Sequence, residues 1–224
     1  MRLHSIPYST NVARVTIALG LKGRVPDEIV QHAPGDRAAL IALSRQPLVP
    51  VLETGDGQVL TDSMPIVEWI DRTWPQPHPL YPADPARRRE VDGFITFFNT
   101  VWKVAPNAIA GERARPEPDE ARIAAWAAQL RGWQHGFDAL LHGRPYLFGD
   151  TPGAADVCAY PFLHFARSAD PGDDDDPFHH VLREHLAQHA GEHENLAAWI
   201  ERMAEPPQLS PTLPGPADPG PGSF

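Results

Sequence analysis

The stretch Leu48-Val49-Pro50-Val51-Leu52-Glu53, followed by Gly55-Asp56-Gly57 and then Val59-Leu60-Thr61-Asp62-Ser63, decides the fold of the first part of the chain. Two short apolar runs separated by a glycine-containing turn are typical of a β-hairpin. Pro50 has no N–H to donate, so we expect it at the first residue of its strand. The stretch therefore predicts a hairpin that is entered through a proline.

The Val49-Pro50 bond allows two interpretations. A cis X-Pro bond costs only about 0.5–1 kcal/mol, and here it would turn Val49 outward, so that its N–H and C=O could pair with an extended ligand. A trans proline at the strand entry fits the spacing equally well, since only about 5–6% of X-Pro bonds are cis. The residues alone leave both interpretations open.

Asp62 and Ser63 stand directly before a run in which Ile66, Val67 and Ile70 recur at helical spacing, so Ser63 is predicted to be the N-cap of a helix. An N-cap hydroxyl beside unpaired helix N–H groups can bind a carboxylate, and Asp62 adds an acceptor for an ammonium group. A ligand with an α-carboxylate and an α-amine would suit this pair. The alternative is a capping pair that only stabilises the helix, by about 1 kcal/mol, and the common use of Ser and Asp at N-caps favours it.

Composition restricts the possible partners. The chain has 224 residues, 42% of them hydrophobic, which is enough for one large domain or two small ones. With 19 Lys+Arg against 29 Asp+Glu, the net charge of −10 argues against nucleic acid or an anionic membrane as the main partner. The single cysteine, Cys158, excludes an intrachain disulfide, and no apolar run approaches the length of a membrane span. We therefore expect a cytoplasmic protein.

The periodicity changes along the chain. Strands are predicted near 2–6, 28–32, Val51 and Val59, and helices near 11–22, 36–43 and 63–74, which gives a βαβαββα domain over residues 1–75. Five prolines within residues 75–86 cannot continue a helix, so residues 76–86 are interpreted as a linker. An all-helical bundle is predicted over residues 87–205, with helices near 86–109, 118–142, 153–169, 177–190 and 193–204. Residues 206–224, rich in Pro and Gly, are predicted to be a flexible tail.

These features together resemble the cytosolic glutathione S-transferase family over roughly residues 1–205. The resemblance is carried by Val49-Pro50, the helix start at Asp62-Ser63, Leu80-Tyr81-Pro82-Ala83-Asp84-Pro85, and the capping-like Gly149-Asp150-Thr151-Pro152-Gly153-Ala154-Ala155-Asp156. It is strongest to the zeta, omega and related bacterial branches. The resemblance implies a thioredoxin-like domain that binds glutathione and a helical domain that supplies the pocket for a hydrophobic electrophile. A homodimer is also expected from it, and no metal is.

The resemblance also implies site residues. Ser9 falls where serine-type members keep the hydroxyl that donates to the glutathione sulfur, and Tyr8 is the second candidate for this catalytic role. Ser9 could instead only cap the helix that follows, a role open to its neighbours as well. The implied glutathione-binding residues are Thr10, Asn11, Arg37, Val49, Pro50, Asp62 and Ser63, with Arg37 placed for the glycine carboxylate. A solvated charge on the helix surface is an equal alternative for Arg37.

The residue types around Ser9 indicate which reaction to expect. No cysteine occurs at residues 8–11, which argues against reductase chemistry through a mixed disulfide, and Cys158 lies in an apolar run typical of a buried position. We therefore expect transfer of the glutathione thiolate to an electrophile. A zeta-type glutathione-dependent isomerase and a non-catalytic interaction or regulatory member of the fold are the alternatives; Leu48, where many relatives carry Gln or Lys, favours the last.

Two further sets of side chains, both in the predicted helical domain, are candidates for a functional role. Asn99 and Trp102, on the first long helix of the helical domain, are the predicted co-substrate pocket residues, because the resemblance places that pocket there. The histidines of the last helices could lie on one helix face, but their spacing matches no closed zinc pattern. We interpret them as a polar helix face: His179, His180, His185, His189 and His193.

Overall fold

The computed structural model describes residues 1–33, 35, 37–168, 174–187 and 190–205. Within these residues the chain divides into two compact units, Met1–Pro75 and Gln76–Glu205. The predicted tail, residues 206–224, lies outside the described residues. No helix in the described part of the chain is long and apolar enough to cross a membrane.

The first unit is built on a four-stranded mixed sheet with the strand order β2-β1-β3-β4. β1 (Arg2–Ser5) pairs in parallel with β2 (Glu28–Gln31) and antiparallel with β3 (Val51–Glu53), which pairs antiparallel with β4 (Val59–Thr61). The helices are α1 (Thr10–Leu21), α2 (Ala38–Ser44) and α3 (Ser63–Thr73). The predicted βαβαββα order is therefore confirmed.

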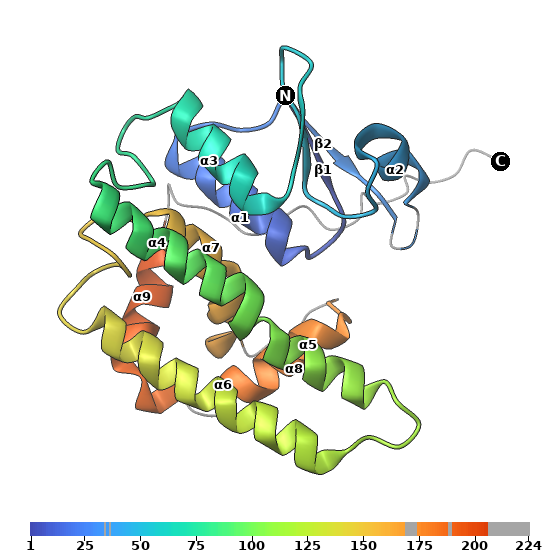
Figure 1. The fold of residues 1–224 in the computed structure, drawn as a ribbon, viewed down its shortest axis with the longest axis vertical. Helices are drawn as coiled ribbons and strands as arrows, with labels where there is room; N and C mark the ends of the chain where they lie inside the picture. Colours follow the sequence, from blue (N-terminus) through green and yellow to red (C-terminus); the bar gives the residue numbers. More distant parts are fainter. Residues whose placement is uncertain (34, 36, 169–173, 188–189, 206–224) are drawn as a thin grey trace. The chain divides into compact units, whose positions relative to one another are not determined.

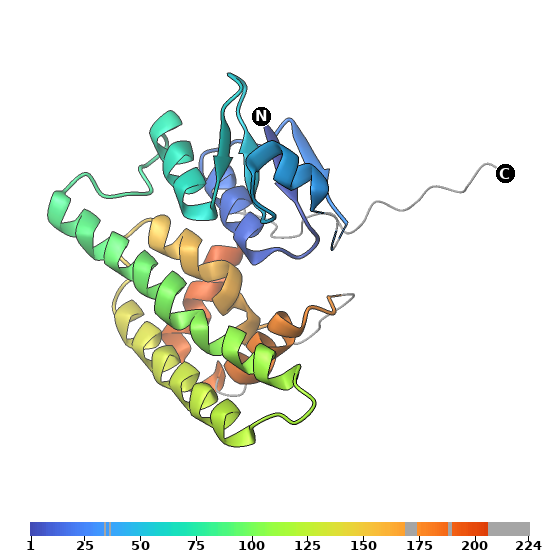
Figure 2. The same cartoon turned by 45° about the vertical axis from the view of Figure 1, so that its right-hand side comes forward.

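Apolar residues at helical and strand spacing form the core of this unit. α1 and α3 lie side by side against the sheet (Figures 1 and 2). Leu3 and Leu52 stand opposite each other in the β1–β3 register, and both are buried, as are Val15 of α1 and Ile66 of α3. Burial of such side chains stabilises the fold by roughly 1.5–3 kcal/mol each.

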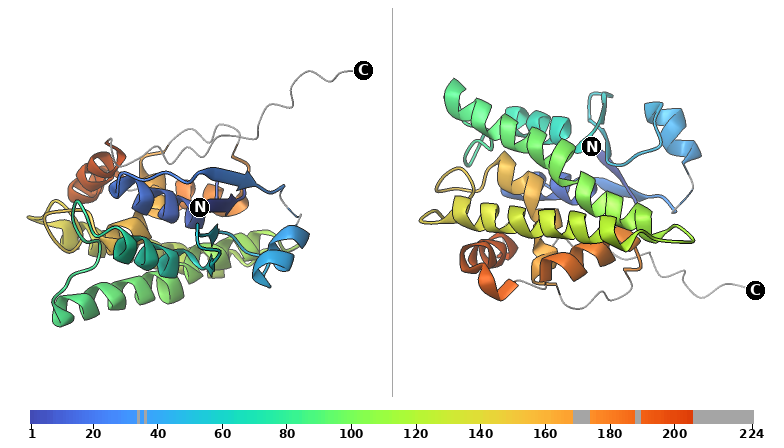
Figure 3. Two further views of the ribbon diagram at one scale, coloured as in Figure 1. Left: turned by 90° about the horizontal axis from the view of Figure 1, so that it is seen from above. Right: turned by 60° about the horizontal axis from the view of Figure 1, so that its bottom comes forward.

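The named elements of the second unit are all helical, as predicted. The elements are α4 (Pro85–Phe97), the π-helical segment η1 (Phe98–Trp102), α5 (Val104–Arg113), α6 (Glu120–Leu141), α7 (Ala154–Leu163), the 3-10 turn η2 (His164–Ala166), α8 (Pro177–Ala187), the 3-10 turn η3 (Ala190–Glu192) and α9 (Glu194–Ala204). An isolated β-bridge joins Tyr146 and Gly149 in the loop before α7. α6 runs beside α5 and also packs against α8 and α9 (Figure 3).

The first long helix differs from its prediction. Instead of a single helix over 86–109, α4 and α5 are joined through η1, where the chain takes a wider π turn. The rings of Phe98 and Trp102 stack with centroids 4.4 Å apart and pack against Phe137 and Phe162. π segments of this kind are often found at functional sites.

A buried carboxylate fixes the start of α7. Asp156 accepts hydrogen bonds from the backbone N–H groups of Leu147 (3.0 Å) and Gly153 (2.9 Å) and from the indole N–H of Trp199 (2.8 Å). Complete burial raises the pKa of the Asp156 carboxyl, although these three donors oppose the shift. A Cβ at Gly153 would lie 3.0 Å from the carbonyl oxygen of Leu80, which explains why this cap position carries no side chain.

Candidate active site

The sheet topology brings most of the predicted site residues to one edge. β1 and β2 are parallel, β3 runs the other way, and β4 runs with β1, so β1, β2 and β4 end at the edge where β3 begins. The loop with Tyr8 and Ser9 follows β1, Arg37 follows β2, Val49 and Pro50 precede β3, and Asp62 and Ser63 follow β4. Figure 1 shows the elements that carry them.

Ser9 is the N-cap of α1. Its Oγ accepts a hydrogen bond from the backbone N–H of Val12 at 3.3 Å, so Ser9 caps this helix whether or not it also has a catalytic role. This bond uses the oxygen as an acceptor and leaves the hydroxyl hydrogen to donate to another atom, such as a sulfur. Tyr8 has a positive φ of 58° and its side chain is 39% exposed. Both candidate donors are therefore compatible with ligand contact.

Val49 offers its backbone at the strand entry. The Val49-Pro50 bond is cis. Within the described part of the chain, no hydrogen bond uses the N–H or C=O of Val49. The neighbouring Leu48 is held instead, because the carboxamide of Gln46 bonds both its N–H (2.7 Å) and its C=O (2.8 Å), while its side chain is 61% exposed.

The start of α3 corrects one detail of the sequence analysis. Asp62, and not Ser63, occupies the N-cap position, and Ser63 is the first residue of the helix. The Asp62 side chain makes no capping hydrogen bond and is exposed, and its backbone has φ 63° and ψ 131°. Such a conformation is costly for a residue other than glycine, by about 1–3 kcal/mol, and is found mainly where function requires it. The carboxylate of Asp62 is thus presented to solvent.

Arg14 is the residue of this edge that the sequence analysis missed. It lies on α1 with 1% of its surface exposed, and its Nη1 donates to Asn11 Oδ1 at 3.3 Å and to Ser63 Oγ at 3.2 Å. An arginine within the apolar face of a predicted helix was the available signal, because a charged side chain is rarely buried without partners. Arg14 connects the first turns of α1 and α3.

Three further predicted residues of the first unit lie in partly exposed positions. Thr10 is the first residue of α1, next to Asn11, and both are partly exposed. Arg37 precedes α2 without a side-chain capping bond and is also partly exposed. Their roles as glutathione-binding residues stay predictions.

The two predicted pocket residues of the second unit differ strongly in exposure. Asn99 is partly exposed on η1. Trp102 is 0% exposed and belongs to the aromatic core with Phe98. Its indole N–H is buried and has no hydrogen-bond partner among the described residues. Of the two, only Asn99 is suited to contact a co-substrate directly.

The histidines of the second unit do not form the polar face that we expected. His179, His185 and His193 are buried. His179 Nδ1 lies 3.0 Å from both carboxylate oxygens of Asp174, which also pairs with Arg183 at 2.6 Å. His180 is exposed, and His189 lies outside the described residues. No group of acidic, histidine or cysteine side chains suited to a metal ion occurs among the residues that the structure describes. Cys158 is buried, as predicted.

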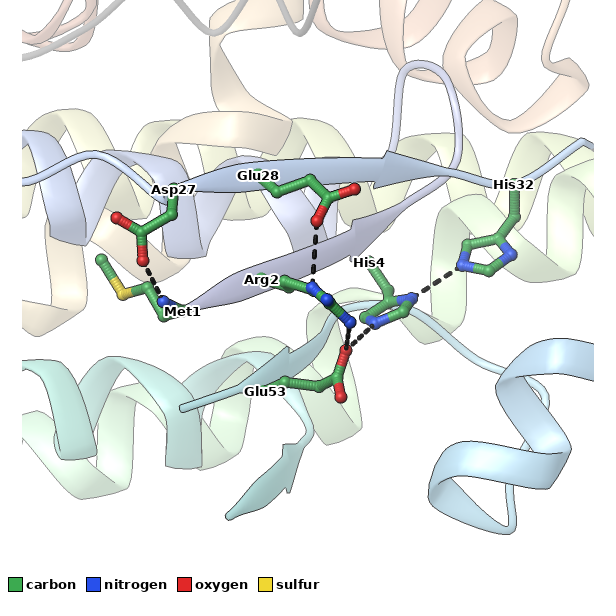
Figure 4. A network of polar contacts seen from close by, with 7 residues as sticks. All are labelled: Met1, Arg2, His4, Asp27, Glu28, His32 and Glu53. Atoms are coloured by element: carbon green, nitrogen blue, oxygen red, sulfur yellow. Dashed lines mark hydrogen bonds and ion pairs between the residues drawn. The ribbon is translucent and has the colours of Figure 1, made fainter. Parts of the chain in front are cut away.

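A polar network crosses the sheet (Figure 4). His4 Nε2 lies 2.9 Å from Glu53 Oε1, and His4 Nδ1 lies 2.9 Å from His32 Nε2. Arg2 pairs with Glu28 at 3.0 Å and approaches Glu53 at 3.6 Å. The hydrogen bond from His4 lowers the pKa of the Glu53 carboxyl below its usual range. This network ties β1 to β2 and β3 and contains none of the predicted site residues.

Comparisons with known proteins agree with this architecture. Family models described as the N-terminal and the C-terminal domain of glutathione S-transferase match residues 3–78 and 120–202. A maleylpyruvate isomerase from Ralstonia sp is 34% identical over 177 residues, which cover 75% of this chain and 82% of that protein. A maleylacetoacetate isomerase from Pseudomonas aeruginosa is 31% identical over 173 residues, covering 74% and 81%. The crystal structure of a glutathione S-transferase from Methylobacterium radiotolerans, in complex with glutathione sulfonate, has 25% identity and a TM-score of 0.70, covering 92% of each chain.

Proposed function

The chain belongs to the glutathione S-transferase family, and we propose that it is an enzyme that activates the thiol of glutathione for attack on an electrophilic small molecule. The observation that carries the proposal is the single sheet edge at which Ser9, the backbone of Val49, which bonds to none of the described residues, and the exposed carboxylate of Asp62 occur. These groups match, in order, the thiol, the peptide backbone and the α-amine of glutathione.

The proposed chemistry begins with the thiolate. Ser9 donates its hydroxyl hydrogen to the sulfur at the N-terminus of α1, where the helix dipole also favours negative charge. Lowering a thiol pKa from about 8.5 by ~2 units requires ~2.7 kcal/mol, which a charge-assisted hydrogen bond and the dipole can supply together. The thiolate sulfur then forms a bond to the electrophilic carbon, and in a transfer the leaving group departs with the bonding electrons.

Binding of the rest of glutathione is divided among the other residues of the edge. Val49 pairs with the cysteinyl N–H and C=O as an added strand would, Asp62 accepts from the α-ammonium and Ser63 donates to the α-carboxylate. Thr10, Asn11 and Pro50 line the cysteinyl part, and Arg37 binds the glycine carboxylate. Asn99 contacts the hydrophobic electrophile on the helical unit.

A glutathione-dependent isomerisation is the second candidate, because the two relatives compared above are isomerases. It starts with the same addition of the thiolate, here to one carbon of a cis double bond. Rotation about the resulting single bond and expulsion of the thiolate then give the trans product and regenerate glutathione. The two reactions thus differ in whether glutathione is consumed.

We also propose that the protein is a cytoplasmic homodimer. The absence of any second cysteine in the sequence supports a reducing compartment, and the family resemblance supports the dimer. Sedimentation equilibrium tests the dimer: a mass near twice the 24.7 kDa of the chain is expected, and a mass of one chain at micromolar concentration would contradict it.

The reaction is tested by two assays on the full chain. Conjugation is followed with an aryl chloride, and isomerisation with maleylacetoacetate, while free thiol is titrated in both. Loss of thiol indicates transfer; trans product with full thiol recovery indicates isomerisation. Ser9→Ala is expected to lower kcat/KM about 100-fold or more, while Tyr8→Phe retains activity. Undiminished activity in Ser9→Ala would assign the role to another donor, and activity in neither assay would favour the non-catalytic alternative.

A further inference from the structure

One guanidinium nitrogen joins the first turns of two helices in the first unit. Nη1 of Arg14 lies within hydrogen-bond distance of Asn11 Oδ1 (3.3 Å) and Ser63 Oγ (3.2 Å). Asn11 belongs to the first turn of α1, and Ser63 is the first residue of α3. Arg14 itself is only 1% exposed, so it acts from inside the domain.

The direction of these hydrogen bonds determines which atoms accept and whether the Ser63 hydroxyl hydrogen is left to donate. An arginine side chain has five N–H donors and no acceptor, so Asn11 Oδ1 and Ser63 Oγ must both accept. With its oxygen engaged in this way, the Ser63 hydroxyl keeps its hydrogen to donate to another group. The buried positive charge also polarises the Ser63 hydroxyl, which makes it a better donor.

A hydroxyl donor at this sheet edge suits an anionic ligand. We propose that Arg14 is a positioning residue of the glutathione site, which orients the Ser63 hydroxyl toward the α-carboxylate of the γ-glutamyl group. This inference rests on the glutathione-binding function proposed above. Arg14 acts on the ligand through Ser63.

The same helix pair contains a matched control. Lys22, directly after α1, pairs with Asp71 near the end of α3 at 2.7 Å, and the Lys22 side chain is 0% exposed. Both basic residues therefore connect α1 with α3 from buried positions, but Lys22 lies at the opposite helix ends from Ser63. If Arg14 only stabilised the helix pair, removal of either cation would affect binding equally.

The test is a double-mutant cycle on the affinity for reduced glutathione, measured by titration calorimetry on the full chain. Arg14→Met and Ser63→Ala are each expected to raise Kd about 10-fold or more, as for loss of a charge-assisted bond. The double variant is expected to stay within about threefold of the weaker single variant, because both changes remove the same contact. Lys22→Met is expected to lower Tm as Arg14→Met does, with Kd within about twofold of wild type.

Arg14→Lys covers the case in which Arg14→Met does not fold. It keeps the charge but not the geometry of the planar fork, so KM for glutathione is expected to rise while kcat at saturating glutathione is retained. The inference would be overturned if the increases in Kd from Arg14→Met and Ser63→Ala multiplied in the double variant. It would also be overturned if Lys22→Met lost as much affinity as Arg14→Met, or if Arg14→Lys left KM unchanged. A folded wild-type chain that binds no glutathione would instead overturn the proposed function, and this inference with it.

Discussion

Tyr8 and Asp62 share an unusual backbone conformation: both have a positive φ, 58° and 63°, and each stands directly before a serine of the proposed site. A residue other than glycine loses free energy in this region, and such residues cluster at binding sites. The two strained positions belong to the loop after β1 and the loop after β4, which meet at one edge of the sheet. The two strained residues thus lie directly before Ser9 and Ser63, which the sequence and the strand order both place at the proposed site.

The first prediction concerns Asp62. Asp62→Gly is expected to stabilise the protein by about 0.5–1 kcal/mol, because glycine adopts a positive φ without strain, and to weaken glutathione binding about 10-fold or more through loss of the carboxylate. Urea unfolding and titration calorimetry measure the two effects. Arg45→Gly is the control, since Arg45 also has a positive φ of 62° but lies at the end of α2, outside the proposed site. Equal binding by Asp62→Gly and wild type would remove Asp62 from the site.

The second prediction concerns the thiol of bound glutathione. A hydroxyl donor favours the thiolate, so its loss in Ser9→Ala is expected to raise the apparent pKa of the bound thiol by about 1–2 units. The ultraviolet absorbance of the thiolate, followed over pH in the complex, gives this value directly. Tyr8→Phe serves as the matched variant; if it shifts the pKa and Ser9→Ala does not, Tyr8 is the donor.

The third prediction concerns the buried carboxylate at the start of α7. Asp156→Ala leaves the N–H groups of Leu147, Gly153 and Trp199 without their acceptor, and about 3–5 kcal/mol of unfolding free energy should be lost. Asp156→Asn keeps a carbonyl acceptor and should lose less. Urea denaturation of the three proteins tests this order. A loss below about 1 kcal/mol in Asp156→Ala would show that the donors find water instead.

The fourth prediction is a dependence of stability on pH. Burial lowers the pKa of His164 from 6.5 to about 4. In this window the unfolded chain binds a proton that the folded chain does not, so the unfolding free energy falls as pH decreases from 6.5 toward 4. His164→Gln removes this contribution, and its loss of stability between pH 7.5 and 5 should be smaller by about 1–2 kcal/mol.

The exposed His180 provides the control for this pH experiment. Denaturant unfolding of His180→Gln at both pH values should show the same loss of stability as wild type. If the slope of His164→Gln matches wild type too, His164 does not contribute to acid sensitivity.

The arrangement of elements could be predicted from the sequence because it follows from local patterns. Alternating apolar residues and glycine turns mark the strands, and prolines mark the end of the first unit. The π segment at Phe98–Trp102 could not be predicted, because the extra residue in its turn depends on how Trp102 stacks in the aromatic core. The same packing buries Trp102, which the sequence suggested for the pocket.

The place of Val49 and Asp62 beside the strands β3 and β4 could be predicted from the sequence, because it follows from local strand and turn patterns; their binding roles stay predictions. The candidate site was not predictable where long-range side-chain contacts matter. The bond from Arg14 to Ser63 joins residues of two helices that are distant in the sequence, and no local pattern contains it. The helix start at Asp62 was misplaced by one residue, since both Asp and Ser are common caps.

A crystal structure of the full chain with reduced glutathione is the sharpest test of the proposed site. We expect hydrogen bonds of about 2.7–3.2 Å between the cysteinyl backbone and that of Val49, with the sulfur beside Ser9 Oγ and the γ-glutamyl group at Asp62 and Ser63. Glutathione bound away from this sheet edge, or absent from it at saturating concentration, would show that the proposed site is wrong.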